Sequence, residues 1–111
     1  MIRPGSVVWV EFDPVTGGEQ GGRRPALVVS SEEHLGAATT LVTVVPATSK
    51  DRGWPNHVAM IGATGLPEPA FAMTEQVRTI SRERVADAVG HVDAECFKLI
   101  CQWVHRWLAP R

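Results

Sequence analysis

The sequence predicts an α+β protein: a small, strongly curved antiparallel sheet or barrel of five or six strands, with one short helix and a C-terminal helix. Runs rich in β-branched and apolar residues recur over the first 92 residues, separated by clusters of glycine, proline and charged residues. A long helical spacing of apolar residues appears only at the end of the chain. The 111 residues leave room for one domain, residues 1–111, because domains typically span about 50 to 250 residues.

The first two strands are expected on either side of a long loop. Residues 6–13 form a β-rich run between Pro4-Gly5 and Asp13-Pro14, which predicts a strand. Residues 14–23 contain four glycines and predict a loop longer than an ordinary hairpin turn; loops of this length are often functional. Residues 25–30 are almost continuously apolar, as expected for a strand buried on both faces.

The middle of the chain predicts a short helix and two further strands. Ser31 is a suitable N-cap, and the acidic residues after it favour a helix that ends at Gly36. Residues 39–48 and 56–61 are β-rich runs that predict strands, with a charged turn over residues 49–55 between them.

The last part of the chain changes from strands to helix. Residues 62–69 hold two glycines and two prolines and predict a connection, while residues 71–80 and 86–92 predict strands joined by a tight turn at 81–84. After Asp93 as N-cap, apolar residues at three- and four-residue spacing predict an amphipathic helix that Pro110 closes. These residues are Cys96, Phe97, Ile100, Trp103, Val104, Trp107 and Leu108.

Composition and charge limit the classes of function. The apolar runs are shorter than the roughly 20 residues that span a bilayer, and the N-terminus has no secretory signal pattern, so we expect no membrane contact and a cytoplasmic location. We interpret Cys96 and Cys101 as reduced core residues, without a metal motif. Because the net charge is only −1, a nucleic-acid site must be local. We expect a groove with cations from Arg3, Arg23, Arg24, Lys50 and Arg52, and with Glu32, Glu33 and Glu68 facing elsewhere.

Arg24 lies at the junction between the glycine-rich loop and the next strand. Pro25 restricts Arg24 to extended conformations, and a guanidinium fixed at a strand end can grip a phosphate with its planar set of donors. From the local sequence alone, a structural salt bridge is an equally good interpretation of this arginine.

Thr48, Ser49 and Lys50 follow another buried strand. Hydroxyl donors at a strand end can stabilise a phosphoryl oxygen as negative charge develops on it. Taken alone, however, a Thr-Ser strand end more often serves turn formation.

Several motifs together resemble the MazF/PemK family of toxins. They are Gly5, Val8-Trp9-Val10-Glu11-Phe12-Asp13-Pro14, Gly18-Glu19-Gln20-Gly21, Arg24-Pro25-Ala26-Leu27-Val28-Val29-Ser30, Val45-Pro46-Ala47-Thr48-Ser49 and Glu75-Gln76-Val77-Arg78-Thr79-Ile80. The resemblance implies an SH3-like barrel that forms a homodimer and cuts single-stranded RNA at short motifs. It also implies a reaction without metal or cofactor, 2′,3′-cyclic phosphate and 5′-hydroxyl ends, arrest of translation and growth, and an antitoxin partner with an acidic tail.

The resemblance assigns catalytic roles to four residues. Arg24 takes the position of the essential arginine, Thr48 that of the threonine that stabilises the pentavalent phosphorus, and Ser49 would assist. Because an arginine pKa exceeds about 12, we expect charge stabilisation from Arg24 before proton transfer. For the general base, Glu75 competes with Glu19 and with Arg24 itself.

The remaining candidates would bind RNA. Trp54 could stack on an unpaired base or pack over the barrel end, and Arg78 could contact backbone phosphates. The other members of this set are Glu19, Gln20, Arg23, Lys50 and Gln76. The four histidines, His34, His57, His91 and His105, are interpreted as structural.

Two alternative functions remain open from the sequence. A CcdB-like toxin of the same architecture inhibits DNA gyrase without cleaving RNA, but such an inhibitor has no need for an arginine beside hydroxyls. The other alternative is a catalytically inactive module that binds RNA or an antitoxin. The helix with Trp103 and Trp107 is most simply core packing, with a dimer or antitoxin contact as the other interpretation.

Overall fold

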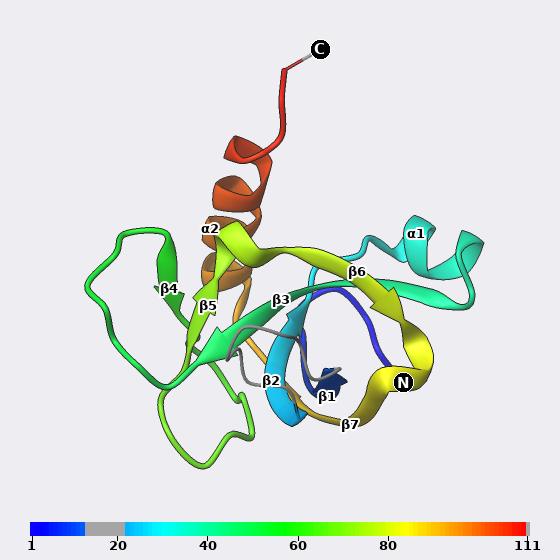
Figure 1. Cartoon of the computed structure of the whole chain (residues 1–111), viewed down its shortest axis with the longest axis horizontal. Helices are drawn as coiled ribbons and strands as arrows, with labels where there is room; N and C mark the ends of the chain where they lie inside the picture. Colours follow the sequence, from blue (N-terminus) through cyan, green and yellow to red (C-terminus); the bar gives the residue numbers. More distant parts are fainter. Residues whose placement is uncertain (13–21, 111) are drawn as a thin grey trace.

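The computed structural model describes residues 1–12 and 22–110 and consists of a curved sheet, a C-terminal helix and short helical segments (Figure 1). The strands are β1 (Ser6–Phe12), β2 (Gly22–Val28), β3 (Leu41–Thr48), β4 (His57–Ala59), β5 (Phe71–Met73), β6 (Arg78–Ser81) and β7 (Val85–His91). The helices are α1 (Glu32–Ala37) and α2 (Ala94–Arg106), with the 3-10 segments η1 (Thr74–Gln76) and η2 (Arg82–Arg84). The predicted α+β class is confirmed.

All strand pairs are antiparallel, and their order is β4-β5-β3-β2-β1-β7, with β6 paired to β3. Figure 1 shows β1, β2, β3, β6 and β7 curving around one space, which is the SH3-like arrangement. The described strand pairs leave β4, β6 and β7 with one partner each, so the sheet curls without closing into a full ring.

The two faces of the sheet carry separate clusters of buried side chains, because successive residues of a strand point to opposite faces. The cluster on one face includes Val7, Leu27, Val45, Ala47, Cys96 and Ile100, the last two from α2. The cluster on the other face includes Val8, Val10, Ala26, Val28, Val42, Val44 and Ile80. Burying each Val or Leu side chain contributes roughly 1.5 to 3 kcal/mol, so the alternating strands supply most of the driving force for folding.

Both predicted helix caps are present. The Ser31 hydroxyl accepts a hydrogen bond from the His34 backbone N–H at 3.0 Å, and the Asp93 carboxylate accepts one from the Cys96 backbone N–H at 3.0 Å. Helix α2 ends at Arg106, before the predicted stop at Pro110. Leu108 lies beyond the end of the helix and is exposed.

The C-terminal end of α2 is tied to the strands by a chain of hydrogen bonds. The Trp107 indole donates to the Thr74 hydroxyl at 3.1 Å, and this hydroxyl donates to the Asn56 carbonyl at 2.7 Å. Trp107 also stacks against Trp103. Trp103 packs against the buried cluster, as the core interpretation predicts, whereas Trp107 is 46% exposed and contacts the strands through this hydrogen bond.

Both cysteines are free thiols, as the sequence predicted. Cys96 is buried between α2 and β4, where its thiol donates to the Ala59 carbonyl. Burial raises the pKa of Cys96 and of Cys101, since a thiolate is costly away from water.

The structure has seven strands where five or six were predicted, and several predicted strand boundaries were wrong. The expected single strand over residues 71–80 is broken by η1, because β5 and β6 both pair with β3. Between the pairs Ala72↔Ala47 and Arg78↔Val44, one side has residues 73–77 and the other only residues 45–46, so the extra residues fold into a 3-10 turn. Strand β2 begins at Gly22, which places Arg23 in a strand rather than in the predicted loop; the rest of that loop lies outside the described residues.

The connection between β4 and β5 is held against β7 by close backbone contacts. A Cβ atom at Gly65 would lie 2.1 Å from the Val89 carbonyl oxygen, and one at Gly90 would lie 2.2 Å from the Ala63 carbonyl oxygen. Gly65 also has a φ of +73°, a region that suits glycine. This packing positions residues 66–70, which form one side of the site described next.

Candidate active site

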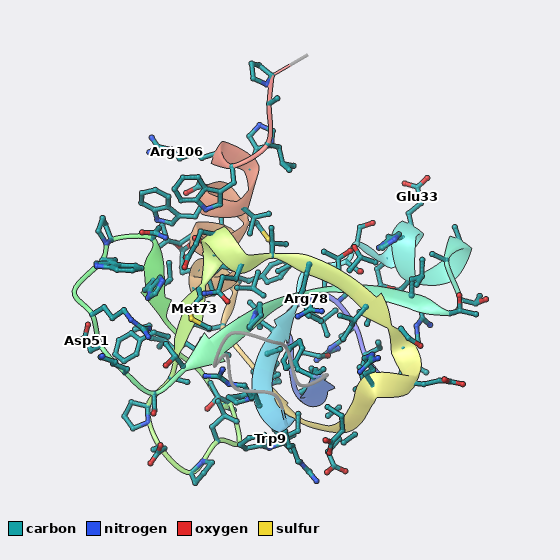
Figure 2. The ribbon with its side chains drawn as sticks, viewed as in Figure 1. Trp9, Glu33, Asp51, Met73, Arg78 and Arg106 are labelled. Atoms are coloured by element: carbon teal, nitrogen blue, oxygen red, sulfur yellow. The ribbon has the colours of Figure 1, made fainter. Side chains whose placement is uncertain are left out.

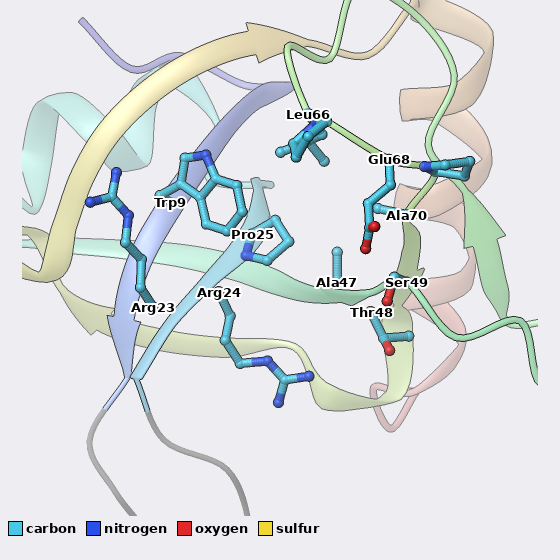
Figure 3. A pocket seen from close by; sticks show the side chains of 12 residues that line it. Trp9, Arg23, Arg24, Pro25, Ala47, Thr48, Ser49, Leu66, Glu68 and Ala70 are labelled. Carbon is cyan, nitrogen blue, oxygen red and sulfur yellow. The ribbon is translucent and has the colours of Figure 1, made fainter.

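A cavity of about 250 Å³ opens where β2 and β3 separate (Figure 3). The two strands pair at Ala26↔Pro46, and beyond that pair β3 continues with β5 instead of β2. Trp9 and residues 23–25 form one wall, residues 47–49 form the second, and residues 66–70 form the third. The cavity therefore lies at the end of the sheet where the sequence predicted the catalytic residues.

Arg24 and Thr48 point to the same face of the sheet. Arg24 is two positions before Ala26 and Thr48 two positions after Pro46, and Ala26 and Pro46 are paired, so alternation puts both side chains on one face. Figure 3 shows both extending to the same side of β2 and β3. Arg24 makes no hydrogen bond or ion pair within residues 1–12 and 22–110, which leaves its guanidinium able to bind a ligand.

The Thr48 hydroxyl is fixed at the end of β3. The threonine is 7% exposed, and its oxygen accepts a hydrogen bond from the Lys50 backbone N–H at 3.2 Å. An accepting hydroxyl keeps its proton as a donor, so Thr48 can donate to an oxygen placed in the cavity. Ser49 adds a second hydroxyl to the same wall, and Lys50 follows in an exposed position.

Arg78 shares the face of Arg24 and Thr48. It pairs with Val44, which precedes Thr48 by four positions on β3, and its guanidinium lies 5.1 Å from the centre of the Phe12 ring. In Figure 2 Arg78 lies between β6 and β2. Two exposed or half-exposed arginines therefore flank one buried hydroxyl on this face.

Arg23 points away from its neighbour. Its guanidinium forms an ion pair with Asp87 of β7 and lies 5.7 Å from the centre of the Trp9 ring. Figure 3 shows Arg23 and Arg24 extending in different directions. Only Arg24 of the two faces Thr48.

Glu68 corrects an expectation from the sequence. We expected its carboxylate to face away from any RNA groove, but Glu68 lines the cavity together with Arg24, Thr48 and Ser49. Its position depends on how residues 60–70 pack on β7, and no local sequence pattern reveals that packing. Two hydrophobic members of the walls, Trp9 and Leu66, were also not recognised as site residues, because the pairing of β1 with β2 places Trp9 and the packing of the connection places Leu66.

Glu75 lies outside the cavity lining, in a cluster with residues of β4. Its carboxylate accepts hydrogen bonds from the His57 ring nitrogen Nε2 at 3.0 Å and from the Asn56 amide at 2.8 Å. Partial burial raises the pKa of Glu75, but the His57 and backbone hydrogen bonds together lower it below its ordinary value. A carboxylate held this way is a weaker base than a typical glutamate.

The other predicted RNA contacts are scattered. Trp54 is 50% exposed and tilts against the His57 ring, with the Arg52 guanidinium 5.7 Å from its own ring centre. Gln76 donates to the Met73 sulfur at 3.6 Å. Arg3 lines a separate cavity near His91, so the structure does not gather the expected five cations into one groove. Glu19 and Gln20 lie outside the described residues.

Two further features concern residues 1–12 and 22–110, the part of the chain that the structure describes. None of the helices there is long and apolar enough to cross a bilayer. No group of three or more His, Cys, Asp or Glu side chains gathers there in a way that could hold a metal ion.

Comparison with known proteins gives consistent matches along almost the whole chain. A family model described as the PemK-like, MazF-like toxin of type II toxin–antitoxin systems matches residues 3–108. Endoribonuclease MazF9 of Mycobacterium tuberculosis is 38% identical over 100 residues, which cover 85% of each chain. Endoribonuclease EndoA of Bacillus subtilis is 31% identical over 97 residues, covering 86% of this chain and 84% of its own.

Solved structures agree with the sequence matches. The crystal structure of MazF from Deinococcus radiodurans aligns with a TM-score of 0.78 at 30% identity, over 95% of this chain and 94% of its own. A MazE–MazF structure from the same organism aligns with a TM-score of 0.77 at 30% identity, over 95% and 93% of the two chains.

Proposed function

Because this chain belongs to the family of PemK-like, MazF-like toxins of type II toxin–antitoxin systems, we propose that it is a toxin that cleaves single-stranded RNA, blocking translation and growth. Relatives at 31% to 38% identity are named endoribonucleases, which favours cleavage over gyrase inhibition. The observation that carries the proposal is the shared face of Arg24 and Thr48 beside the cavity.

The reaction needs no protein nucleophile. The ribose 2′-oxygen attacks the adjacent phosphorus, the bond from phosphorus to the 5′-oxygen breaks, and the products carry a 2′,3′-cyclic phosphate and a 5′-hydroxyl. The 2′-hydroxyl loses a proton and the leaving 5′-oxygen gains one. No metal is required for these steps, because charge stabilisation comes from side chains.

Arg24 and Thr48 stabilise the pentavalent phosphorus. The Arg24 guanidinium can donate two hydrogen bonds to the phosphoryl oxygens as their negative charge increases, and the Thr48 hydroxyl donates a third. Ser49 and Lys50 assist from the same strand end, and Arg78 binds a neighbouring phosphate. For proton transfer, Arg24 and Glu19 remain the candidates beside Glu75, which must first leave His57 and Asn56.

The proposal includes protein partners. A MazE–MazF complex of Deinococcus radiodurans is among the structures that this chain resembles, so we expect a cognate antitoxin that covers the cavity with an acidic segment. We also expect the chain to act as a homodimer in the cytoplasm, where its messenger RNA substrates are.

The experiment that tests this function compares two adjacent arginines. Purified wild type, Arg24→Ala and Arg23→Ala are incubated with a long unstructured RNA in EDTA, and the cut ends are mapped. We expect 5′-hydroxyl ends from the wild type, a rate at least about 100-fold lower for Arg24→Ala, and a change below about fivefold for Arg23→Ala.

Three results would contradict the proposal. Cleavage that disappears in EDTA would exclude the metal-free reaction. Equal losses in the two arginine variants would exclude a specific role for Arg24. An inactive wild type that is folded and monodisperse would exclude the nuclease.

A further inference from the structure

The cavity beside Arg24 and Thr48 is chemically asymmetric. Two arginines line it, and Arg23 is already paired with Asp87, so Arg24 is the cation left for a ligand. Trp9, Pro25 and Leu66 give the cavity apolar walls, and Arg24 extends to the opposite side of the strands from them (Figure 3). On the third side the Glu68 carboxylate extends from the connection toward β3, as Figure 3 shows. Glu68 makes no hydrogen bond or ion pair within the part of the chain that the structure describes.

The apolar walls suit the flat face of an unpaired base. Single-stranded RNA is commonly held by aromatic and apolar side chains on which its bases stack. At about 250 Å³ the cavity is slightly below the range of about 300 to 1,000 Å³ that holds drug-sized ligands, so it fits one base rather than several.

The opposite charges at the two sides orient a nucleotide. A phosphate is attracted to Arg24 and repelled by the Glu68 carboxylate, so the phosphate lies at the Arg24–Thr48 side and the base lies toward Glu68. A carboxylate without a protein partner in this position would only weaken RNA binding unless a donor on the base compensates for it.

We propose that Glu68 selects the base next to the cleaved phosphate, favouring bases that carry an amino group over uracil. An ionised carboxylate only accepts hydrogen bonds. Cytosine and adenine present an exocyclic amino donor, and guanine presents two adjacent donors that match both carboxylate oxygens. Uracil offers one N–H between two carbonyl oxygens, which repel the carboxylate. This inference rests on the proposed function for the substrate class, since it deepens the specificity of that site.

The test measures binding without cleavage. Fluorescein-labelled 2′-O-methyl hexamers of adenosine, cytidine and uridine lack the attacking hydroxyl, so fluorescence anisotropy gives equilibrium affinities. We expect the wild type to bind the adenosine or the cytidine hexamer about tenfold more tightly than the uridine hexamer, which corresponds to one well-placed hydrogen-bonded contact. In Glu68→Gln and Glu68→Ala this ratio should fall to within about twofold.

The matched control is Glu33→Gln, which removes an exposed carboxylate in the first turn of α1, outside the cavity. It should keep the wild-type ratio. Because Glu68 is exposed, its variants should unfold at the wild-type temperature, and thermal unfolding of each variant checks this.

The outcomes separate this inference from the proposed function. A wild type without preference for amino-bearing bases, or a preference that survives both Glu68 variants, overturns the role of Glu68 even if the protein cuts RNA. A preference that depends on Glu68 supports the role even if cleavage in EDTA fails, in which case only the nuclease assignment is lost.

Discussion

Arg23 and Arg24 are neighbouring residues of the same type, but they point to opposite faces of β2 and so have different environments. Arg23 forms an ion pair with Asp87 and lies over Trp9, while Arg24 faces Thr48 and makes no polar contact within the described residues. The sequence left a salt bridge and a phosphate site as equal interpretations of Arg24. The pairing register keeps Arg24 out of the ion pair with Asp87, because one residue of shift would exchange the two arginines; the phosphate site stays a proposal.

At Thr48 we expect the hydroxyl to matter more than the shape of the side chain. Thr48→Val keeps the buried volume but removes the donor, so the single-turnover rate at saturating RNA should fall about 100-fold. Thr48→Ser keeps the donor and should stay within about tenfold of the wild type. Equal losses in both variants would mean that packing, rather than the hydroxyl, supports the reaction.

At Glu75 we expect a contribution to stability that depends on pH. Partial burial raises the pKa of Glu75, but the His57, backbone and Gln76 hydrogen bonds together lower it by more, so the folded protein favours the ionised carboxylate. This stabilisation is present above the unfolded-state pKa, near 4, and is lost as the pH falls through the lower folded pKa. Glu75→Gln should therefore reduce the free energy of unfolding at pH 7 and differ little from the wild type at pH 3.

Urea unfolding at several pH values measures this effect. Glu68→Gln is the control, because it removes a carboxylate without a hydrogen bond in the described structure and should show no such trend. Cleavage by Glu75→Gln should stay within about threefold of the wild type. A loss near 100-fold, with stability unchanged, would instead make Glu75 the general base.

At the scale of elements, the sequence predicted those whose signals are local. The caps at Ser31 and Asp93 act within one helical turn, so they could be recognised directly. The 3-10 turn η1 could not, because it arises from unequal chain lengths between two pairings with β3. The position of Glu68 was missed for a similar reason: it depends on contacts between residues 62–65 and β7, far apart in sequence.

The connection before β5 should be sensitive to added volume. Gly65→Ala places a methyl group against the Val89 carbonyl at a φ that alanine avoids, so we expect a loss of roughly 2 to 4 kcal/mol in the free energy of unfolding. Because this connection carries Glu68, the preference between the adenosine and uridine hexamers should also weaken.

Gly36→Ala is the matched control for Gly65→Ala. Gly36 lies inside α1, and nothing stands within 4 Å of the site where its Cβ would be. Alanine there should stabilise the protein by about 0.5 to 1 kcal/mol and leave base preference unchanged. Chemical denaturation measures the stability of both variants, and hexamer binding measures their base preference. Equal changes in the free energy of unfolding would show that the close contact at Gly65 has no effect.

At the scale of the whole molecule, the net charge is small and the cationic side chains are divided between different roles. The net charge is −1, so the long-range field gives RNA little attraction, and we expect the proposed RNA binding to depend on the face that carries Arg24 and Arg78. Arg52 and Arg106 lie over the rings of Trp54 and Trp103, and Arg82 donates to the carbonyls of Leu35 and Ala38 at the end of α1, so several cations serve the fold instead. The expectation of a local site came from the sequence, whereas only the structure shows which cations contact aromatic rings and backbone carbonyls.

This distribution predicts a shallow dependence of RNA binding on salt. Each phosphate contact to single-stranded RNA contributes about −0.7 to the slope of log affinity against log salt, so contacts from Arg24, Arg78 and Lys50 give a slope near −2. Affinities of a 2′-O-methyl hexamer between 50 and 200 mM salt measure this slope.

Arg78→Ala should bring the slope to about −1.4. Arg106→Ala should leave it unchanged, because that guanidinium lies over Trp103 on α2. A slope of −5 or steeper would show that RNA follows a broader basic surface than the Arg24–Thr48 face, and a slope unaffected by Arg78→Ala would remove this residue from the phosphate contacts.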